Sequence, residues 1–220
     1  MVGGGVGGGV KVEIWSDVAC PWCAIGKRRL EAALADFPQR EDVEVRWRSF
    51  ELDPQAPRVR AESSTDHLAA KYRTSREQAL EMQRRVTEAA AEDGLDFHFE
   101  RARGGNTFDA HRLLHLAAGS GLQGVLKDRL FTAYLTEGEA IGDQDTLHRV
   151  AVDAGIDADA ARAVLDSDAY ADAVRADERE ALELGISAVP FFVVDRRYGV
   201  AGAQPAPVLR QLLDRALDDR

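Results

Sequence analysis

The chain has 220 residues, of which 45% are hydrophobic and 30% charged, the proportions of a globular protein that can bury a core. Its 28 Lys and Arg residues against 38 Asp and Glu residues give a formal net charge of −10, which repels nucleic-acid backbones and anionic membrane surfaces. No stretch approaches the roughly 18 apolar residues of a membrane span, so we expect neither a nucleic acid nor a membrane as partner.

The first residues (MVGGGVGGGV) are rich in glycine, and we expect a flexible tail over residues 1–9. This segment lacks the basic and apolar regions of a secretory signal. Two cysteines are too few for the disulfide framework of a small secreted protein. We therefore expect a cytoplasmic protein.

After the tail, the pattern predicts strand, helix and strand. Apolar and polar residues alternate from Val10 to Trp15, which is typical of a half-buried strand. Helical spacing begins at Pro21, a residue that suits the first helical position, and Pro38 ends the helix. Alternation returns over residues 43–48, so residues 10–60 are predicted to form one βαβ unit.

Two cysteines lie where the first strand meets this helix, in the stretch Cys20-Pro21-Trp22-Cys23. The unpaired N–H groups and positive dipole end of a helix N-terminus favour a thiolate, and can lower a cysteine pKa from about 8.5 into roughly 3.5–7.5. As a structural bridge the pair would close a tiny loop and stabilise the fold little. We predict Cys20 as the nucleophile, Cys23 as the more buried thiol that resolves a mixed disulfide, and Pro21 and Trp22 as residues that tune the potential.

A C-x-x-C pair is also half of a zinc site, but a closed site needs four ligands and the sequence has no second cysteine pair. His111 and His115 stand four residues apart on one predicted helix, yet the stretch HRLLH lacks the glutamate of the metalloprotease motif. We expect ordinary histidines and no metal.

The region after Asp53-Pro54 has helical periodicity, and residues 61–180 are predicted to form a helical insertion. A capping box at residues 74–77 is expected to open one helix, which Gly94 closes. Further helices are predicted at residues 107–118, 122–136, 146–154, 158–165 and 168–184. The acidic stretch from Asp153 to Glu183 is expected to be a solvated helix face.

β character returns near the C-terminus. Residues 191–194 (FFVV) and 198–201 predict a strand pair around a short turn, and Pro205 opens a last amphipathic helix. Residues 181–220 thus form a predicted ββα unit. Because neither half alone makes an adequate sheet, we expect an α/β fold whose two halves are separated by the insertion.

These motifs together resemble the DsbA-like branch of the thioredoxin superfamily, and within it the FrnE-like group, which is related to 2-hydroxychromene-2-carboxylate isomerases. The likeness rests on VEIWSDVACPWCAIGKRRLE, NTFDAHRLLHLA and GISAVPFFVVDRRYGVAGAQP, and covers nearly the whole chain from Lys11. It implies a thioredoxin-like fold with a large inserted all-helical domain. It also implies a cis bond before Pro190, facing the Cys20 sulfur, and substrate pairing with the backbone of Val189.

The resemblance leaves two functions open. One is a thiol–disulfide oxidoreductase of the protein disulfide oxidoreductase or isomerase type, with thiol- or disulfide-containing substrates, a redox-recycling partner and no bound cofactor. Oxidation, isomerisation and reduction stay open, because direction depends on the potential and the partner. The alternative is a glutathione-dependent isomerase or transferase of small aromatic or polyketide-like molecules, with glutathione as co-substrate. The isomerase relatives carry Ser in place of Cys20, so the presence of Cys20 and Cys23 favours the oxidoreductase.

Overall fold

One mixed sheet of four strands lies at the centre of the part of the chain that the computed structural model describes, residues 9–219. Its strands are β1 (Val10–Ser16), β2 (Val43–Ser49), β3 (Phe191–Val194) and β4 (Tyr198–Ala201). Their order is β2-β1-β3-β4; β1 and β2 are parallel, and β3 is antiparallel to both its neighbours. The tail predicted over residues 1–9 lies outside the described residues except for Gly9.

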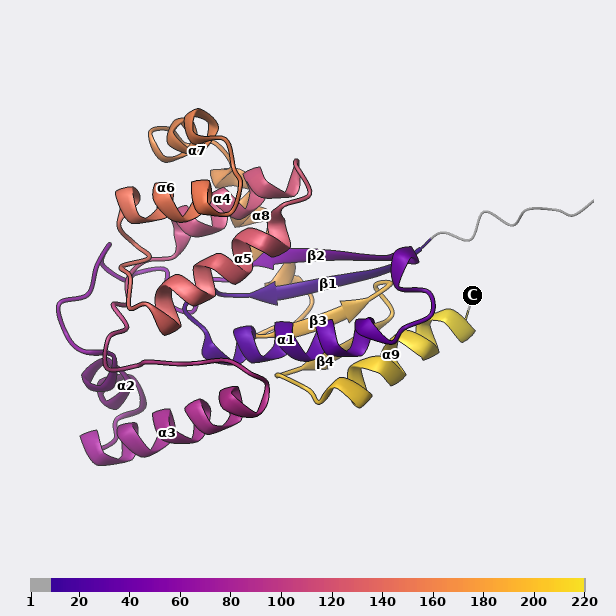
Figure 1. Cartoon of the computed structure of the whole chain (residues 1–220), viewed down its shortest axis with the longest axis horizontal. Helices are drawn as coiled ribbons and strands as arrows, with labels where there is room; N and C mark the ends of the chain where they lie inside the picture. The colour runs from indigo at the N-terminus through magenta and orange to yellow at the C-terminus, as the bar shows by residue number, and fades with distance from the viewer. Residues whose placement is uncertain (1–8, 220) are drawn as a thin grey trace, which may run out of the picture.

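Two helices cover one face of this sheet (Figure 1). α1 (Pro21–Ala35) makes the crossover that the parallel strands β1 and β2 require, and a short 3₁₀ turn (Arg40–Asp42) leads into β2. α9 (Ala206–Asp218) packs beside α1. Leu30 of α1 and Leu209 of α9 share one buried cluster with the inward residues of β1. The predicted βαβ and ββα units therefore join into one sheet, as expected.

The chain between β2 and β3 is largely helical. Its elements are α2 (Ser64–Tyr72), α3 (Arg76–Glu92), α4 (Phe108–Ala118), α5 (Gln123–Phe131), a π-helical turn (Thr132–Thr136), α6 (Gln144–Asp153), α7 (Ala158–Leu165) and α8 (Ala171–Glu183). The helix predicted over residues 122–136 is thus interrupted: the N–H of Glu137 donates to the carbonyl of Thr132, five residues back, at 3.0 Å. π turns of this kind occur often at functional sites.

The capping box of α3 is displaced by one residue from the prediction. Ser75, not Thr74, is the N-cap, and its side chain and that of Gln78 bond each other's backbone N–H groups. This satisfies two of the donors that a helix N-terminus leaves free. α2 was not predicted, because its nine residues carry no clear apolar spacing.

The second face of the sheet is covered by the insertion, so β1 is buried on both faces and not half-buried as predicted. Glu13 of β1, 1% exposed, pairs with Arg48 of β2 and with Arg196.

Asp177 of α8, 2% exposed, pairs with Arg48 at 2.7 Å and accepts a hydrogen bond from the N–H of Ser49 at 2.9 Å. The expectation of a fully solvated acidic face between Asp153 and Glu183 was therefore wrong at Asp177, which ties α8 to β2.

A single apolar cluster joins the start of α1 to the insertion. Cys23 and Ile25 of α1 belong to the same buried group as Leu113 of α4 and Leu126 and Leu130 of α5. Figure 1 shows α5 lying beside the N-terminal part of α1, and the two helices are in contact. The two cysteines therefore lie at the junction between the sheet-bearing part and the insertion.

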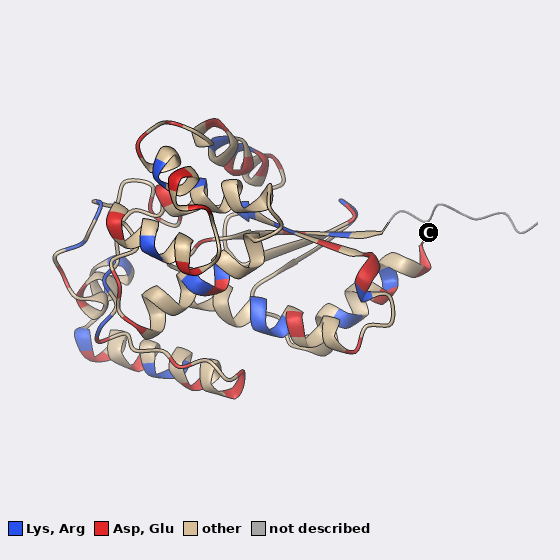
Figure 2. Ribbon diagram, turned by 45° about the horizontal axis from the view of Figure 1, so that its top comes forward, with Lys and Arg blue, Asp and Glu red and all other residues tan. Residues whose placement is uncertain are grey.

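The outer surfaces of the helices carry both signs of charge. Figure 2 shows Lys/Arg and Asp/Glu residues alternating along α3, where Arg84 pairs with Glu81 at 2.7 Å. Over the described residues, no helix combines the length and apolar character needed to cross a bilayer.

Candidate active site

The cysteine pair lies at the first turn of α1. Cys20 is the N-cap residue, with extended backbone (φ −94°, ψ 112°), and Pro21 is the first helical residue. The N–H of Cys20 donates to the carbonyl of Asp17 at 3.2 Å, and the N–H of Cys23 to the carbonyl of Cys20 at 3.0 Å. Both thiols are free and buried, Cys20 with 5% and Cys23 with 0% of its surface exposed. Trp22, at 41%, projects into solvent beside them.

A second segment, immediately before β3, faces the outer thiol. The Val189–Pro190 peptide bond is cis, which confirms what the resemblance implied. The Cys20 thiol lies 3.7 Å from the carbonyl oxygen of Val189, in position to donate to it. Gly26 of α1 lies against the Pro190 ring: a Cβ at position 26 would be 3.0 Å from Pro190 Cγ. The structure thus brings together all the residues predicted for the site.

A buried carboxylate lies beside the thiols. Asp17 is 1% exposed; its Oδ2 accepts the N–H of Leu52 at 2.7 Å and its Oδ1 accepts that of Ala19 at 3.3 Å. Nε2 of His111, itself 1% exposed, lies 3.4 Å from Asp17 Oδ1. Although burial favours the neutral acid, His111, the Leu52 N–H and the charge of Lys127 together lower the pKa of Asp17.

A buried cation lies on the other side, supplied by α5. Lys127 is fully buried, and its Nζ lies 5.6 Å from the centre of the Trp47 ring and 5.3 Å from that of Phe131. Nζ donates to the carbonyl of Ser16 at 3.4 Å. Burial lowers the pKa of Lys127 to about 8, while the negative charges of Cys23 and Asp17 act in the opposite direction.

These groups affect the two thiols differently. A hydrogen bond to Cys23, burial and the nearby Asp17 raise the pKa of Cys20. Burial opposes ionisation of Cys23 too, but the hydrogen bond from Cys20, the charge of Lys127 and the Ser16 hydroxyl lower the pKa of Cys23. The sequence-based expectation considered only the helix N-terminus and put the thiolate on Cys20. The buried side chains favour the anion on Cys23 in the reduced pair.

Sequence reasoning named His111 as an ordinary histidine and missed Asp17 and Lys127. His111 and His115 do share one side of α4, but each meets a different carboxylate: His111 lies beside Asp17, and Nε2 of His115 lies 3.1 Å from Asp177. The described residues contain no group of three His, Cys, Asp or Glu side chains that could hold a metal ion. The only sequence signal for Asp17 and His111 was their presence inside the stretches that carry the family resemblance.

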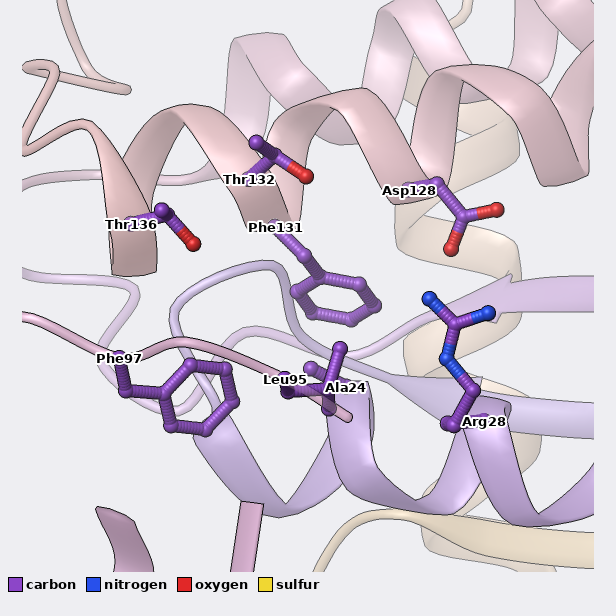
Figure 3. Close-up of a pocket in the computed structure, with 8 residues that line it drawn as sticks. All are labelled: Ala24, Arg28, Leu95, Phe97, Asp128, Phe131, Thr132 and Thr136. Carbon is purple, nitrogen blue, oxygen red and sulfur yellow. The ribbon is translucent and has the colours of Figure 1, made fainter. Parts of the chain in front are cut away.

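A shallow pocket flanks α1 next to the dithiol (Figure 3). It holds about 370 Å³ of empty space, part of it open solvent. Phe131 forms its centre and Arg28 points toward Asp128 at one end. Its lining residues are Ala24, Arg28, Leu95, Phe97, Asp128, Phe131, Thr132 and Thr136. Neither sulfur lines it, so we assign the chemistry to the opposite side of α1, where Val189 faces Cys20.

Comparison with known proteins places this site in context. A family model described as a DsbA-like thioredoxin domain matches residues 11–214. A solved structure of a probable DsbA oxidoreductase from Streptomyces coelicolor is 48% identical; the match covers 96% of this chain and 91% of that one, with a TM-score of 0.91.

Two more distant structures share the fold. The cytosolic disulfide reductase DsbM from Pseudomonas aeruginosa, solved with GSH, is 20% identical over 94% of this chain and 99% of its own, with a TM-score of 0.63. A 2-hydroxychromene-2-carboxylate isomerase is 14% identical over 95% and 97%, with a TM-score of 0.69.

Proposed function

The chain belongs to the family of DsbA-like thioredoxin domains, and we propose that it is a thiol–disulfide oxidoreductase whose reacting groups are the sulfurs of Cys20 and Cys23. The observation that carries the proposal is the arrangement of the pair. The outer sulfur faces the carbonyl of Val189 at 3.7 Å, and the inner one is fully buried, where the charge of a buried lysine lowers its pKa. One thiol can therefore meet a substrate, while the other can react only with its neighbour.

The reaction follows from this geometry. In the reducing direction, the Cys20 thiolate attacks one sulfur of a substrate disulfide; a mixed disulfide forms and the other substrate sulfur leaves as a thiolate. Cys23 then gives its proton to water, its thiolate attacks Cys20 Sγ, the Cys20–Cys23 bond forms and the second substrate sulfur leaves. Both leaving thiolates take protons from water. The dithiol loses two electrons and the substrate disulfide gains them, and the same steps in reverse oxidise a substrate dithiol.

The segment before β3 is the proposed substrate-binding edge. Ser187 and Ala188 are exposed and lead to the half-buried Val189, so an extended peptide can lie along this backbone with its sulfur at Cys20. An open backbone edge of this kind suits a protein or peptide disulfide, whereas a small-molecule substrate would call for a closed cavity. We propose no bound cofactor.

We further propose that the enzyme acts in the cytoplasm and is recycled by a separate thiol partner, with glutathione as a candidate. The support is the shared fold of DsbM, which is described as a cytosolic disulfide reductase and was solved with GSH. The similarity to the isomerase favours a second candidate, glutathione-dependent isomerisation or transfer on a small aromatic molecule. That reaction gives no role to a second, fully buried thiol, which is why we favour the first.

The test compares wild type, Cys20→Ser, Cys23→Ser and the double variant in insulin reduction and in refolding of scrambled ribonuclease. We expect Cys20→Ser and the double variant to fall to the uncatalysed rate. Cys23→Ser should accumulate a mixed disulfide with the substrate, visible by mass spectrometry, because the resolving thiol is gone. Full insulin reduction by Cys20→Ser would refute the proposal. Undiminished turnover of an aromatic substrate with glutathione by both single variants would support the isomerase.

A further inference from the structure

Lys127 is buried without a carboxylate partner. Its side chain has 0% exposure, and no carboxylate of residues 9–219 lies within 4.0 Å of its Nζ. Its hydrogen bond to the Ser16 carbonyl is long, at 3.4 Å. A buried ammonium is costly unless another charge or hydrogen bond compensates it. Lys27 provides the comparison: it is 5% exposed, but it pairs with Glu31 and, at 2.5 Å, with Asp128.

The groups around Lys127 come from several elements. Lys127 interacts electrostatically with Cys23 and Lys27 of α1, with Cys20 at the N-cap of α1, with Asp17 in the turn after β1 and with His111 of α4. Of the anions, Asp17 already accepts two backbone N–H groups. Cys23 exerts the largest stabilising effect on the Lys127 charge, ahead of Asp17 and Cys20. The anion that Lys127 lacks is therefore the one that the reduced dithiol provides.

The Cys23 side of this contact is equally incomplete without the cation. A fully buried thiolate is disfavoured by the loss of water. The Ser16 hydroxyl and the backbone N–H of Asp17 also favour this thiolate, and the Ser16 Oγ has no hydrogen-bond partner among the described residues. Once Cys20 is bound to a substrate sulfur, it has no proton to donate. Lys127, the Ser16 hydroxyl and the Asp17 backbone then remain as the groups that stabilise the Cys23 thiolate, and Lys127 is the one that carries a positive charge.

We infer that Lys127 is the positioning residue of the resolving step: from the helical insertion it holds the Cys23 sulfur as a thiolate beneath Cys20, ready to attack the mixed disulfide. This inference rests on the proposed oxidoreductase function. The step itself is the one written above, in which the Cys20–Cys23 bond forms, the substrate sulfur leaves and water protonates it; Lys127 transfers no electrons and keeps its proton. Because the cation stabilises the dithiol with its thiolate and not the neutral disulfide, it also makes the pair more oxidising.

The first test isolates the inner thiol. In a Cys20→Ser background the one remaining thiol is Cys23, and its ionisation is followed by thiolate absorbance near 240 nm against pH. We expect Lys127→Met to lower the ionisation constant of Cys23 at least tenfold. Lys27→Met is the matched control, since it removes a buried lysine four residues along α1 that has its own carboxylates, and should change the constant less than twofold. Equal shifts in the two variants would overturn the inference.

The second test needs no variant and decides the matter if Lys127→Met does not fold. Coupling is reciprocal, so oxidation of the dithiol, which removes the Cys23 charge, must lower the pKa of Lys127. The chain has four lysines, Lys11, Lys27, Lys71 and Lys127, so ¹³C-lysine spectra are simple to follow. We expect one lysine to have a lower pKa in the oxidised protein than in the reduced protein. The difference should be at least threefold in the ionisation constant of that lysine. Four unchanged titrations would refute the inference.

Both tests use no disulfide substrate, so they fail independently of the proposed function. If the pKa of Cys23 depends on Lys127 but the protein does not reduce insulin, the proposed function is refuted and the electrostatic contact between Lys127 and Cys23 stands. If the protein reduces insulin but the pKa of Cys23 does not depend on Lys127, the proposed function stands and the inference about Lys127 is refuted.

Discussion

Replacing Gly26 by alanine tests whether α1 holds the substrate-binding edge in place. Gly26 lies inside α1, where its missing side chain lets the helix approach the segment before β3. An added Cβ would lie 3.0 Å from Pro190 Cγ and 3.3 Å from Phe192 Cζ. Both distances are shorter than ordinary van der Waals contact, so Pro190 or α1 must move by a few tenths of an ångström.

The magnitude follows from two opposing effects. Alanine is favoured over glycine in a helix interior by about 1 kcal/mol. Overpacking of a dense core costs about 1–3 kcal/mol. We therefore expect Gly26→Ala to be destabilised by about 0–2 kcal/mol. If Pro190 moves, the backbone of Val189 moves with it and must return to its original position when substrate binds. We expect this return to cost about 1 kcal/mol, which raises KM about fivefold.

The assay pairs this variant with a matched control. Gly124 lies in the first turn of α5 with nothing within 4 Å of an added Cβ, so Gly124→Ala should gain up to about 1 kcal/mol and leave KM unchanged. Stability is measured by urea unfolding, KM by peptide disulfide reduction, and Cys20 reactivity by iodoacetamide. We expect Gly26→Ala to raise KM and leave the alkylation rate within twofold. A Gly26→Ala protein as stable as Gly124→Ala, with wild-type KM, would show that this contact positions nothing.

Three further predictions concern single residues. Asp177→Ala should cost about 1–3 kcal/mol in urea unfolding, because it leaves the buried Ser49 N–H without its acceptor, while Arg48 keeps Glu13 as a buried partner; no measurable loss would contradict this. Despite burial, its neighbours lower the pKa of Asp177, so its stabilisation is present above pH about 4 and is lost as pH falls further, and the variant should show a shallower acid loss than wild type. Ser75→Ala removes the α3 cap and should cost about 1 kcal/mol by the same assay; no loss would mean that Gln78 suffices. Trp22→His adds a cation beside the thiols and should make the pair more oxidising in a glutathione redox titration; a wild-type potential already near −120 mV would refute the role of Trp22.

The sheet, the dithiol and most of the helices could be predicted because their signals are local. The alternation in β1, Pro21 at the start of α1 and the FFVV run of β3 each depend on a few neighbouring residues. The helix predicted over residues 122–136 failed only at its end, where the π turn begins. The spacing of apolar residues is too similar in the two cases to distinguish a helix that stays α-helical to its end from a helix whose last turn is a π turn.

What could not be predicted depends on contacts between distant parts of the chain. β1 was expected to face solvent on one side, but Asp177 and its neighbours on α8 cover that side from more than 160 positions away. Lys127 looks like any helical lysine in the sequence, and only the fold brings it to the Ser16 carbonyl, 111 residues earlier. Sequence patterns predict that a lysine is exposed, and a buried one becomes visible only when its neighbours are known.

The placement of charge around the pair explains how two similar thiols can have different roles. A helix N-terminus acts mainly on Cys20, which sits at the N-cap. Asp17 opposes that effect, because its negative charge raises the pKa of Cys20, while Lys127 favours the anion on Cys23. These charges favour the anion on the buried sulfur of the resting dithiol. In the proposed reaction the anion moves to Cys20 when a proton passes between the two sulfurs, and it forms again on Cys23 once Cys20 is bound to substrate. In the proposed mechanism the insertion that supplies Lys127 therefore takes part in catalysis, because without it the inner sulfur would lose its counter-charge.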